Sequence, residues 1–309
     1  MAAAVPPLIA TLEAGGTKMI AGLASGPGSI LLRKQIPTTS PEETLDTLID
    51  FFSKAARAYP APGALAVGSF GPVDLDRSSP TFGQLTDTPK PGWAGTNLLS
   101  SLQRTLGVPS VIETDVNASL YGESRWGAAK RCLSSAYLTV GTGIGGGLML
   151  EGRLVHGTGH PEMGHMMVRP HEEDRFTGCC PFHGRCLEGL ASGPALEKRW
   201  KVPAAELPPG HIAWTYQADY LAQACLNLLM IAPPERIILG GGVMHQSHLF
   251  PMIRRRLKEL LHSYLPYPQL REDLTEFIVP PSLGADSALL GCVALGQDFL
   301  RSGKGRPLN

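Results

Sequence analysis

The chain has 309 residues, of which 43% are hydrophobic and 17% charged. This length suggests two lobes of ordinary size, and the composition is that of a soluble globular protein with a large core to bury. The 27 basic and 27 acidic residues cancel, and no basic stripe stands out, so nucleic acid is not an expected partner.

The N-terminal sequence argues against a signal peptide, and the lengths of the apolar runs argue against a membrane span and association with a membrane. The first residues hold no basic region, and Pro6 and Pro7 interrupt the apolar run that a signal peptide needs. No run approaches the roughly 18 apolar residues of a membrane span. Cys132, Cys225 and Cys292 lie singly in apolar stretches, as reduced core cysteines do. We therefore expect a cytoplasmic protein.

Strands and helices alternate in the first part of the chain. Ser40 has the character of an N-cap, and Pro41 that of a first helical residue, so a helix is predicted to follow. The other elements follow from apolar runs and turn residues. Strands are predicted at 8–12, 19–24, 30–36, 65–67 and 108–113, and helices at 41–58, from 97 onward and at 119–125.

The turn between the first two strands is a candidate phosphate site. Gly15 and Gly16 allow backbone N–H groups to crowd around an anion, Thr17 adds a hydroxyl and Lys18 a positive charge. A plain β-hairpin uses Gly-Gly equally well, and for this turn alone the hairpin is favoured.

Two later glycine-rich turns make a polyphosphate site more credible. Between two apolar strands, five of the seven residues 141–147 are glycine. This is no dinucleotide-binding fingerprint, because a strand follows, and no Walker loop, because no Lys-Ser/Thr pair closes it. A third turn, 240–244, follows the strand 237–239 and suits the close approach of a base or ribose. Helices are expected from 191, at 214–230, 251–265 and 286–300, with a last strand at 278–279.

Polar or turn residues follow several strands at the edge where ligand loops of α/β sheets lie. Gly71 and Pro72 belong to a turn-rich segment after the strand 65–67. Asp115 lies at a strand-to-helix turn, either as an N-cap or as a carboxylate directed at a ligand. For Asn97 the roles of helix cap and ligand contact remain equally supported.

The segment 156–188 holds three of the six cysteines and five of the nine histidines, which points to a metal. Cys180, His183 and Cys186 follow C-x2-H-x2-C spacing, which suits tetrahedral zinc. His165 is the candidate for the fourth ligand.

Two alternatives bear on this site. Ordinary thiols and surface imidazoles would be an unusual coincidence in a chain poor in cysteine. Adjacent cysteines do not easily both reach one ion, so either Cys179 or Cys180 is the ligand. The shorter loop to His183 favours Cys180.

The ordered set of motifs resembles the ROK family of sugar kinases, and within it the bacterial fructokinase branch. The resemblance covers nearly the whole chain, and the ordered set is far more specific than any single motif. The motifs are Glu13-x-Gly-Gly-Thr-Lys, Thr114-Asp115-Val116-Asn117-Ala, the loop 141–147, Glu162-x-x-His165, the knuckle ending in Cys186-Leu-Glu188, and Leu239-Gly-Gly-Gly242.

The resemblance implies an α/β fold of the two-lobed actin-like or hexokinase-like ATPase type, with ribonuclease-H-like topology, a cleft between the lobes and an inserted zinc-binding loop. The small lobe would comprise 1–117 with the C-terminal helix 289–309. The large lobe would comprise 118–288, with the zinc knuckle at 160–188.

The resemblance also implies ATP-dependent phosphorylation of a hexose, D-fructose to fructose 6-phosphate, with Mg²⁺, a structural Zn²⁺ and a homodimeric assembly. Asp115 would be the general base that takes the proton of the attacking hydroxyl. The other roles fall on three sets of residues. Sugar ligands would be Gly71, Pro72, Asn97, Thr114, Asp115, Glu162, His165 and Glu188; ATP ligands Glu13, Gly15, Gly16, Thr17, Lys18, Gly141, Thr142, Gly143, Gly145, Gly240, Gly241, Gly242 and Val243; zinc ligands His165, Cys180, His183 and Cys186.

The chain departs from the wider family at a few positions, and other functions compete. Glu13 stands where Asp is common, while Thr114 and His183 resemble the fructokinase branch. A mannokinase or broad hexokinase is the nearest alternative. Repressors of this superfamily carry an added winged-helix domain, and only about seven residues precede the first strand here. A zinc hydrolase needs an open metal position, which four protein ligands do not leave.

Overall fold

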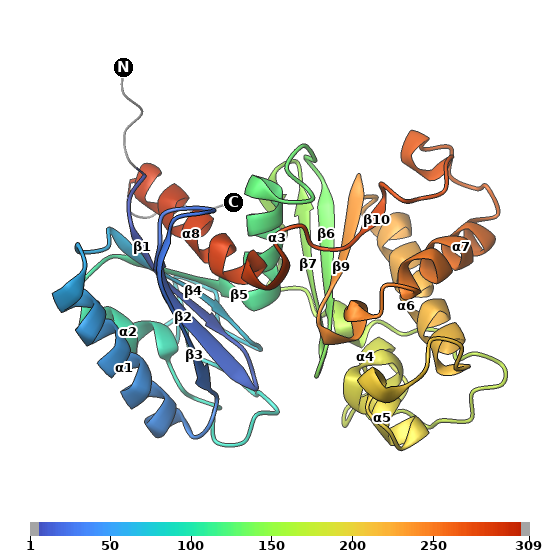
Figure 1. Cartoon of the computed structure of the whole chain (residues 1–309), viewed down its shortest axis with the longest axis horizontal. Helices are drawn as coiled ribbons and strands as arrows, with labels where there is room; N and C mark the ends of the chain where they lie inside the picture. Colours follow the sequence, from blue (N-terminus) through green and yellow to red (C-terminus); the bar gives the residue numbers. More distant parts are fainter. Residues whose placement is uncertain (1–5, 304–309) are drawn as a thin grey trace. The chain divides into compact units, whose positions relative to one another are not determined.

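The computed structural model describes residues 6–303 and divides into two compact α/β units, each of which is described by itself (Figure 1). Of the described residues, the first unit takes in 6–130, 153–160 and 283–303, and the second 131–152 and 161–282. Among the residues described, no helix has the length and apolar character that crossing a membrane requires.

The first unit is built on a five-stranded sheet in the order β3-β2-β1-β4-β5. The pairs β1/β2 and β2/β3 are antiparallel, whereas β1/β4 and β4/β5 are parallel. The three parallel strands therefore end at the same edge, where Ala14, Ser69 and Thr114 lie in register. The strands are β1 (Ile9–Ala14), β2 (Lys18–Ala24), β3 (Ile30–Pro37), β4 (Ala64–Ser69) and β5 (Ser110–Thr114).

Helices cover both faces of this sheet (Figure 1). The α3 and α8 helices pack closely because two glycines leave room for the opposing backbone. A Cβ on Gly291 would lie 1.7 Å from the Ala118 oxygen, and one on Gly122 would lie 2.5 Å from the Ser287 oxygen. The helices are α1 (Pro41–Ala58), α2 (Leu98–Leu106), α3 (Asp115–Trp126) and α8 (Ser287–Arg301), with a 3₁₀ turn η5 (Gly284–Asp286) before α8.

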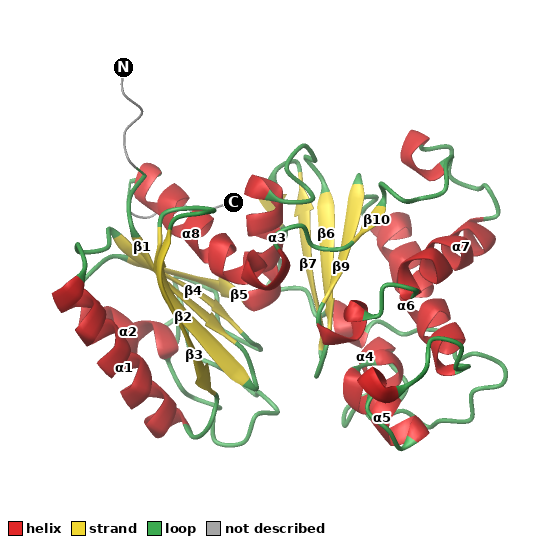
Figure 2. Ribbon diagram, in the orientation of Figure 1, coloured by secondary structure: helices red, strands yellow, loops and turns green. Residues whose placement is uncertain are grey.

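The second unit has its own sheet, in which β10, β9, β6 and β7 lie side by side. The β6/β7 pair is an antiparallel hairpin, while β9 runs parallel to β6 and to β10. The helices α6 (Ala213–Ile231) and α7 (Leu249–Leu261) pack together beside this sheet (Figure 2). The strands are β6 (Ser135–Val140), β7 (Ile144–Leu150), β9 (Arg236–Gly240) and β10 (Ile278–Val279), and the segment after β7 holds the short β8 (Arg153–Leu154) of the first unit.

Four helices and several single turns complete the second unit. The long α6 is buried along most of its length, as its apolar sequence predicts. The helices are α4 (Leu187–Ala191), α5 (Gly193–Trp200), α6 (Ala213–Ile231) and α7 (Leu249–Leu261), and the 3₁₀ turns are η1 (Met163–His165), η2 (Ala204–Glu206), η3 (Gly242–His245) and η4 (Pro268–Leu270).

The predicted elements are present, with shifts at their ends. Ser40 caps α1 by accepting from the Glu43 N–H at 3.3 Å, as predicted. The α3 helix begins at Asp115, four residues before the predicted start, and α4 was not predicted. Residues 304–309 of the predicted C-terminal helix lie outside the described part.

The compact units differ in extent from the predicted lobes. Residues 118–130 and 283–288 group with the first unit, because the whole of α3 packs along α8. The segment 153–160 also joins that unit. The functional division into a small and a large lobe stays a prediction.

Candidate functional site

Asp115 lies where β5 passes into α3, at the carboxyl edge of the first sheet. Thr114 is the N-cap, and its Oγ1 accepts from the Asn117 N–H at 3.1 Å. The alternative that Asp115 itself caps the helix is therefore wrong. Asp115 is the first helical residue, and its Oδ1 accepts from the Val116 N–H at 2.8 Å.

Glu13 lies on β1 of the same sheet, paired with Gly68 of β4. Its Oε2 is buried and has no hydrogen-bond partner. Burial and, after it, the charge of Asp115 raise the pKa of Glu13 to about 7. An unpartnered carboxylate oxygen near a second carboxylate is an electrostatic setting that a divalent cation would relieve, so the Glu13 carboxylate fits Mg²⁺.

Gly68 brings the start of α3 close to the sheet. A Cβ at this position would lie 2.9 Å from the Ala118 Cβ and 3.4 Å from the Asp115 Cα. A larger residue would push the first turn of α3 outward. Gly68 was absent from the predicted site residues, and only its place at the end of a parallel strand points to this packing role.

Asn97 and the Gly71–Pro72 loop also belong to the first unit. Asn97 is the N-cap of α2: its Oδ1 accepts from the Ser100 N–H at 2.9 Å, and its Nδ2 donates to the Phe82 oxygen at 2.8 Å. The cap role is thus confirmed, and the second amide hydrogen remains for other contacts. The Gly71–Pro72 peptide is cis.

The first glycine turn is a β-hairpin. The Gly15 N–H donates to the Lys18 oxygen at 3.0 Å, and Ala14 pairs with Met19. Gly16, Thr17 and Lys18 are exposed. The hairpin interpretation is correct, and it leaves these residues accessible to an anion.

The second glycine loop is shorter than predicted. Its turn is confined to 141–143, where the Gly141 N–H donates to the Gly143 oxygen at 2.9 Å. Gly145 lies inside β7, opposite Thr139. The glycine run in β7 serves packing, because a Cβ on Gly146 would lie 2.6 Å from the Met163 side chain.

Three backbone segments converge at this turn within the second unit. At the start of α5, the Gly193 N–H donates to the Gly141 oxygen at 2.8 Å. A Cβ on Gly141 would lie 3.9 Å from the Gly242 nitrogen. Gly241 has a φ of 90°, and a Cβ there would lie 2.5 Å from the Val140 backbone, so no other residue fits. The glycine-rich turns 141–143 and 240–243 thus lie close together in the second unit, and Val243 of the latter turn is buried.

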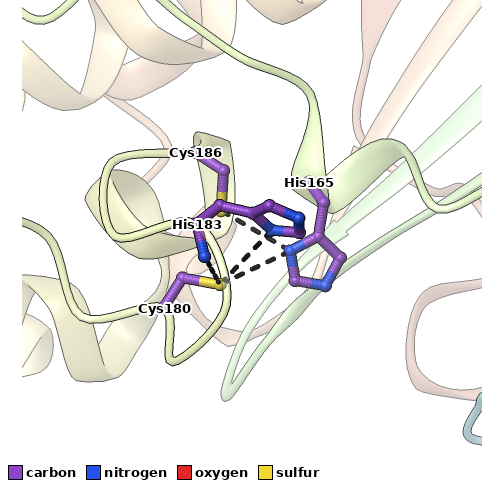
Figure 3. Close-up of side chains that lie close together, drawn as sticks. All are labelled: His165, Cys180, His183 and Cys186. Carbon is purple, nitrogen blue, oxygen red and sulfur yellow. Dashed lines mark hydrogen bonds between the residues drawn. The ribbon is translucent and has the colours of Figure 1, made fainter.

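Four side chains of the second unit gather around one point (Figure 3). His165, Cys180, His183 and Cys186 each offer a ligand atom, and these atoms all lie within 4.8 Å of one another. The His165 Nδ1 lies 3.6 Å from the Cys180 Sγ and 3.5 Å from the Cys186 Sγ, and the His183 Nδ1 lies 3.7 Å from the Cys180 Sγ.

These separations fit tetrahedral zinc. Zn–S bonds of about 2.3 Å and Zn–N bonds of about 2.0 Å at the tetrahedral angle place sulfur and nitrogen roughly 3.5 Å apart. Cys179 lies outside the cluster, and its N–H donates to the Gly189 oxygen at 2.9 Å. The geometry favours Cys180.

The short α4 helix links the cluster to the glycine turn. Cys186 is its N-cap, and Glu188 lies in its first turn. The Glu188 Oε2 accepts from the Ile144 N–H at 2.8 Å, next to the turn 141–143. Glu162 precedes η1, the turn that carries His165. Since Nδ1 of His165 faces the sulfurs, its Nε2 lies on the opposite side of the ring.

Comparisons with known proteins agree with the predicted resemblance. The family model described as "ROK family" matches residues 9–298. A putative fructokinase of Bacillus subtilis (strain 168) is 41% identical and covers 96% of this chain and 97% of its own length. The fructokinase of Zymomonas mobilis is 42% identical, over 92% of this chain and 94% of its own.

A solved structure supports the fold. The ROK hexokinase from Thermus thermophilus matches this chain with a TM-score of 0.78 and 27% sequence identity. The match covers 96% of this chain and 100% of the hexokinase chain. The α/β architecture of two sheets is thus that of a sugar kinase. This chain belongs to the ROK family.

Proposed function

We propose that this protein is a fructokinase, which transfers the γ-phosphoryl group of ATP to D-fructose and forms fructose 6-phosphate. The observation that carries the proposal is an identity of 41–42% over nearly the whole of two relatives named fructokinase or putative fructokinase. The kinase architecture and the candidate site described above agree with it.

The proposed base is Asp115, which would accept the proton of the attacking sugar hydroxyl. Phosphoryl transfer needs little covalent chemistry from the protein, so placing the hydroxyl in line and neutralising charge are the main tasks. The position of Asp115 at the carboxyl edge of a parallel sheet supports this role. Gly71, Pro72, Asn97 and Thr114 would contact the sugar from the same unit.

ATP would be held by the exposed hairpin turn 15–18 and by the glycines that line one place in the second unit. Backbone N–H groups at such turns bind phosphate oxygens, and Lys18 adds charge. Bound Mg²⁺ would neutralise charge on the phosphates, and Glu13 is the carboxylate that fits it. The glycines proposed are Gly141, Gly143 and Gly240 to Gly242, with Thr142 and Val243 beside them.

The Cys/His cluster would hold a structural zinc ion. Its donor set and spacing support that metal, and four protein ligands leave no position for a reactive water. His165 would then present Nε2 to the sugar, and Glu162 and Glu188 would be fixed by the same loop. A cytoplasmic homodimer, with the two lobes as its functional domains, completes the proposal.

A panel of fructose, mannose and glucose with ATP tests the proposal, with ADP release and product identity as readouts. We expect kcat/KM to be highest for fructose and the product to be fructose 6-phosphate. A higher value for mannose or glucose would instead indicate the alternative of a mannokinase or a broad hexokinase.

A further inference from the structure

A buried carboxylate lies directly before the turn that carries Asp115. Glu113, on β5, is only 6% exposed. Its Oε2 lies 2.7 Å from the His156 Nε2, and both residues belong to the first unit. The pair joins residues 43 positions apart in the sequence. None of the motifs that indicate a kinase includes His156.

The second oxygen of Glu113 holds both sides of Asp115. Its Oε1 accepts from the Thr114 N–H at 2.9 Å and from the Asn117 Nδ2 at 2.9 Å. Thr114 is the N-cap of α3, and Asn117 is fully buried in the first turn. The Asp115 backbone is thus bracketed by two groups that one carboxylate fixes.

The surroundings of His156 favour its protonated form. The hydrogen bond to Glu113 raises the pKa of His156, burial opposes this, and the negative charge of Glu113 and a backbone contact with Leu154 raise the pKa further. Removing one member of such a pair leaves a buried charge uncompensated, which is costly. Without His156, Glu113 would need another partner, and its two contacts with the α3 turn would be disturbed.

A second histidine fixes the same segment to the first unit. The Val73 N–H donates to the His160 Nε2 at 3.3 Å, beside the Gly71–Pro72 loop. A Cβ on Gly71 would lie 3.1 Å from the His160 ring, so this loop and the histidine are closely packed. His156 is therefore held in place by contacts at both ends of 156–160.

We propose that His156 and Glu113 are positioning residues, an ion pair that fixes the turn between β5 and α3 so that Asp115 meets the sugar hydroxyl. The inference rests on the proposed kinase function. Neither residue needs to touch the substrate. His156 holds the Glu113 carboxylate in place, and Glu113 in turn holds Thr114 and Asn117 through its hydrogen bonds.

Two substitutions separate the ion pair from simple packing. His156→Ala removes the cation, whereas His156→Gln keeps a neutral N–H donor of similar reach. We expect kcat to fall roughly 10- to 100-fold in H156A, because small displacements of a catalytic group cost that much. The KM for ATP should stay within about twofold. H156Q should recover part of kcat.

The matched control is His262→Gln, at an exposed histidine of the second unit. It should leave kcat unchanged. A packing role alone would lower the yield of folded H156A but leave the kcat of each folded molecule intact, and that result would overturn the proposal.

The deciding experiment follows NMR signals without any substrate. The His156 imidazole should remain protonated above pH ~6.5, where an ordinary histidine is mostly neutral, and Glu113→Gln should lower the pKa of His156. The Thr114 amide should exchange faster with solvent in H156A. Identical titrations in wild type and E113Q, or unchanged Thr114 exchange, would overturn the proposal. An enzyme that fails to phosphorylate fructose would refute the proposed function alone, since these signals need no activity.

Discussion

The Glu13 carboxyl lies in an electrostatic setting that raises its pKa from the ordinary 4.5 to about 7. Glu13 and Asp115 both lie in the first unit, and Asp115 is the second cause, after burial, of the raised pKa of Glu13. A structural carboxylate would normally be satisfied by a donor. The buried and unpartnered Glu13 Oε2 is better explained by a function that brings a cation to it.

Asp115→Asn should bind fructose and turn over hardly at all. Loss of a general base typically lowers the rate by about 100- to 10,000-fold, while an amide of equal size keeps the turn folded. Steady-state kcat and KM for fructose measure the effect. Asp46→Asn, at an exposed position on α1, is the control and should match the wild type. Near wild-type kcat in D115N would exclude Asp115 as the base.

Glu13→Gln should stabilise the protein without Mg²⁺ at pH 8. The folded pKa of about 7 exceeds the ordinary value of 4.5, so the folded protein retains a proton that the unfolded chain releases between these values. Stability therefore declines as pH rises through this window, and the neutral amide should avoid about 2–3 kcal/mol of that loss.

Urea unfolding at pH 4.5 and pH 8 checks this prediction. The gain from E13Q should be present at pH 8 and nearly absent at pH 4.5, where Glu13 is protonated in the folded protein and only half ionised in the unfolded chain. An equal difference at the two pH values would contradict the assigned cause. Phosphorylation by E13Q should nevertheless fall, because the carboxylate is lost.

At the scale of elements, the short α4 helix ties the Cys/His cluster to a glycine turn. Its N-cap is Cys186, a member of the cluster, and it carries Glu188, which accepts from the Ile144 N–H at 2.8 Å. Disordering the knuckle would therefore release both Glu188 and the β6/β7 turn. The proposed zinc would act on the chemistry through this short path.

Cys180→Ser should remove the metal, and Cys179→Ser should retain it. The Cys180 Sγ lies in the cluster, whereas Cys179 lies outside. Elemental analysis should find one zinc per chain in the wild type and in C179S, and far less in C180S. Fructose phosphorylation should be lost in C180S while α6 and the sheets remain folded, as judged by circular dichroism. Equal zinc in both variants would exclude the assigned ligand set.

The sequence predicted the elements whose cause is local. Ser40 and Pro41 mark the start of α1, and the C-x2-H-x2-C spacing marks the Cys/His cluster. It did not predict α4, which has only five residues and depends on its contacts with the knuckle for stability. Gly145 was misread as part of a loop, because glycine composition alone does not distinguish a phosphate turn from a strand packed tightly against a neighbour.

The Glu113–His156 pair shows what a sequence pattern does not reveal. Its members are 43 residues apart, and neither lies in a recognisable spacing. The local sequence allowed Asp115 to be either the N-cap of a helix or a carboxylate directed at a ligand. The structure excludes the cap role, because α3 begins at Asp115 and Thr114 is its N-cap. Contacts between distant segments, rather than local propensity, decided these points.

At the scale of the whole molecule, the proposed roles are divided between two compact units. The first holds Asp115 and Glu13, and the second holds the Cys/His cluster and the glycine turns of β6/β7 and β9/η3. Each unit is an α/β structure with its own sheet.

The central claim is that fructose is the phosphoryl acceptor, and the most direct measurement is the conversion of fructose and ATP by the purified protein, followed by ³¹P NMR. We predict a fructose 6-phosphate signal that grows as the γ-phosphate signal of ATP disappears, with a lower kcat/KM for mannose and glucose. No phosphorylated fructose at millimolar substrate, from protein that is folded and loaded with zinc and Mg²⁺, would contradict the account.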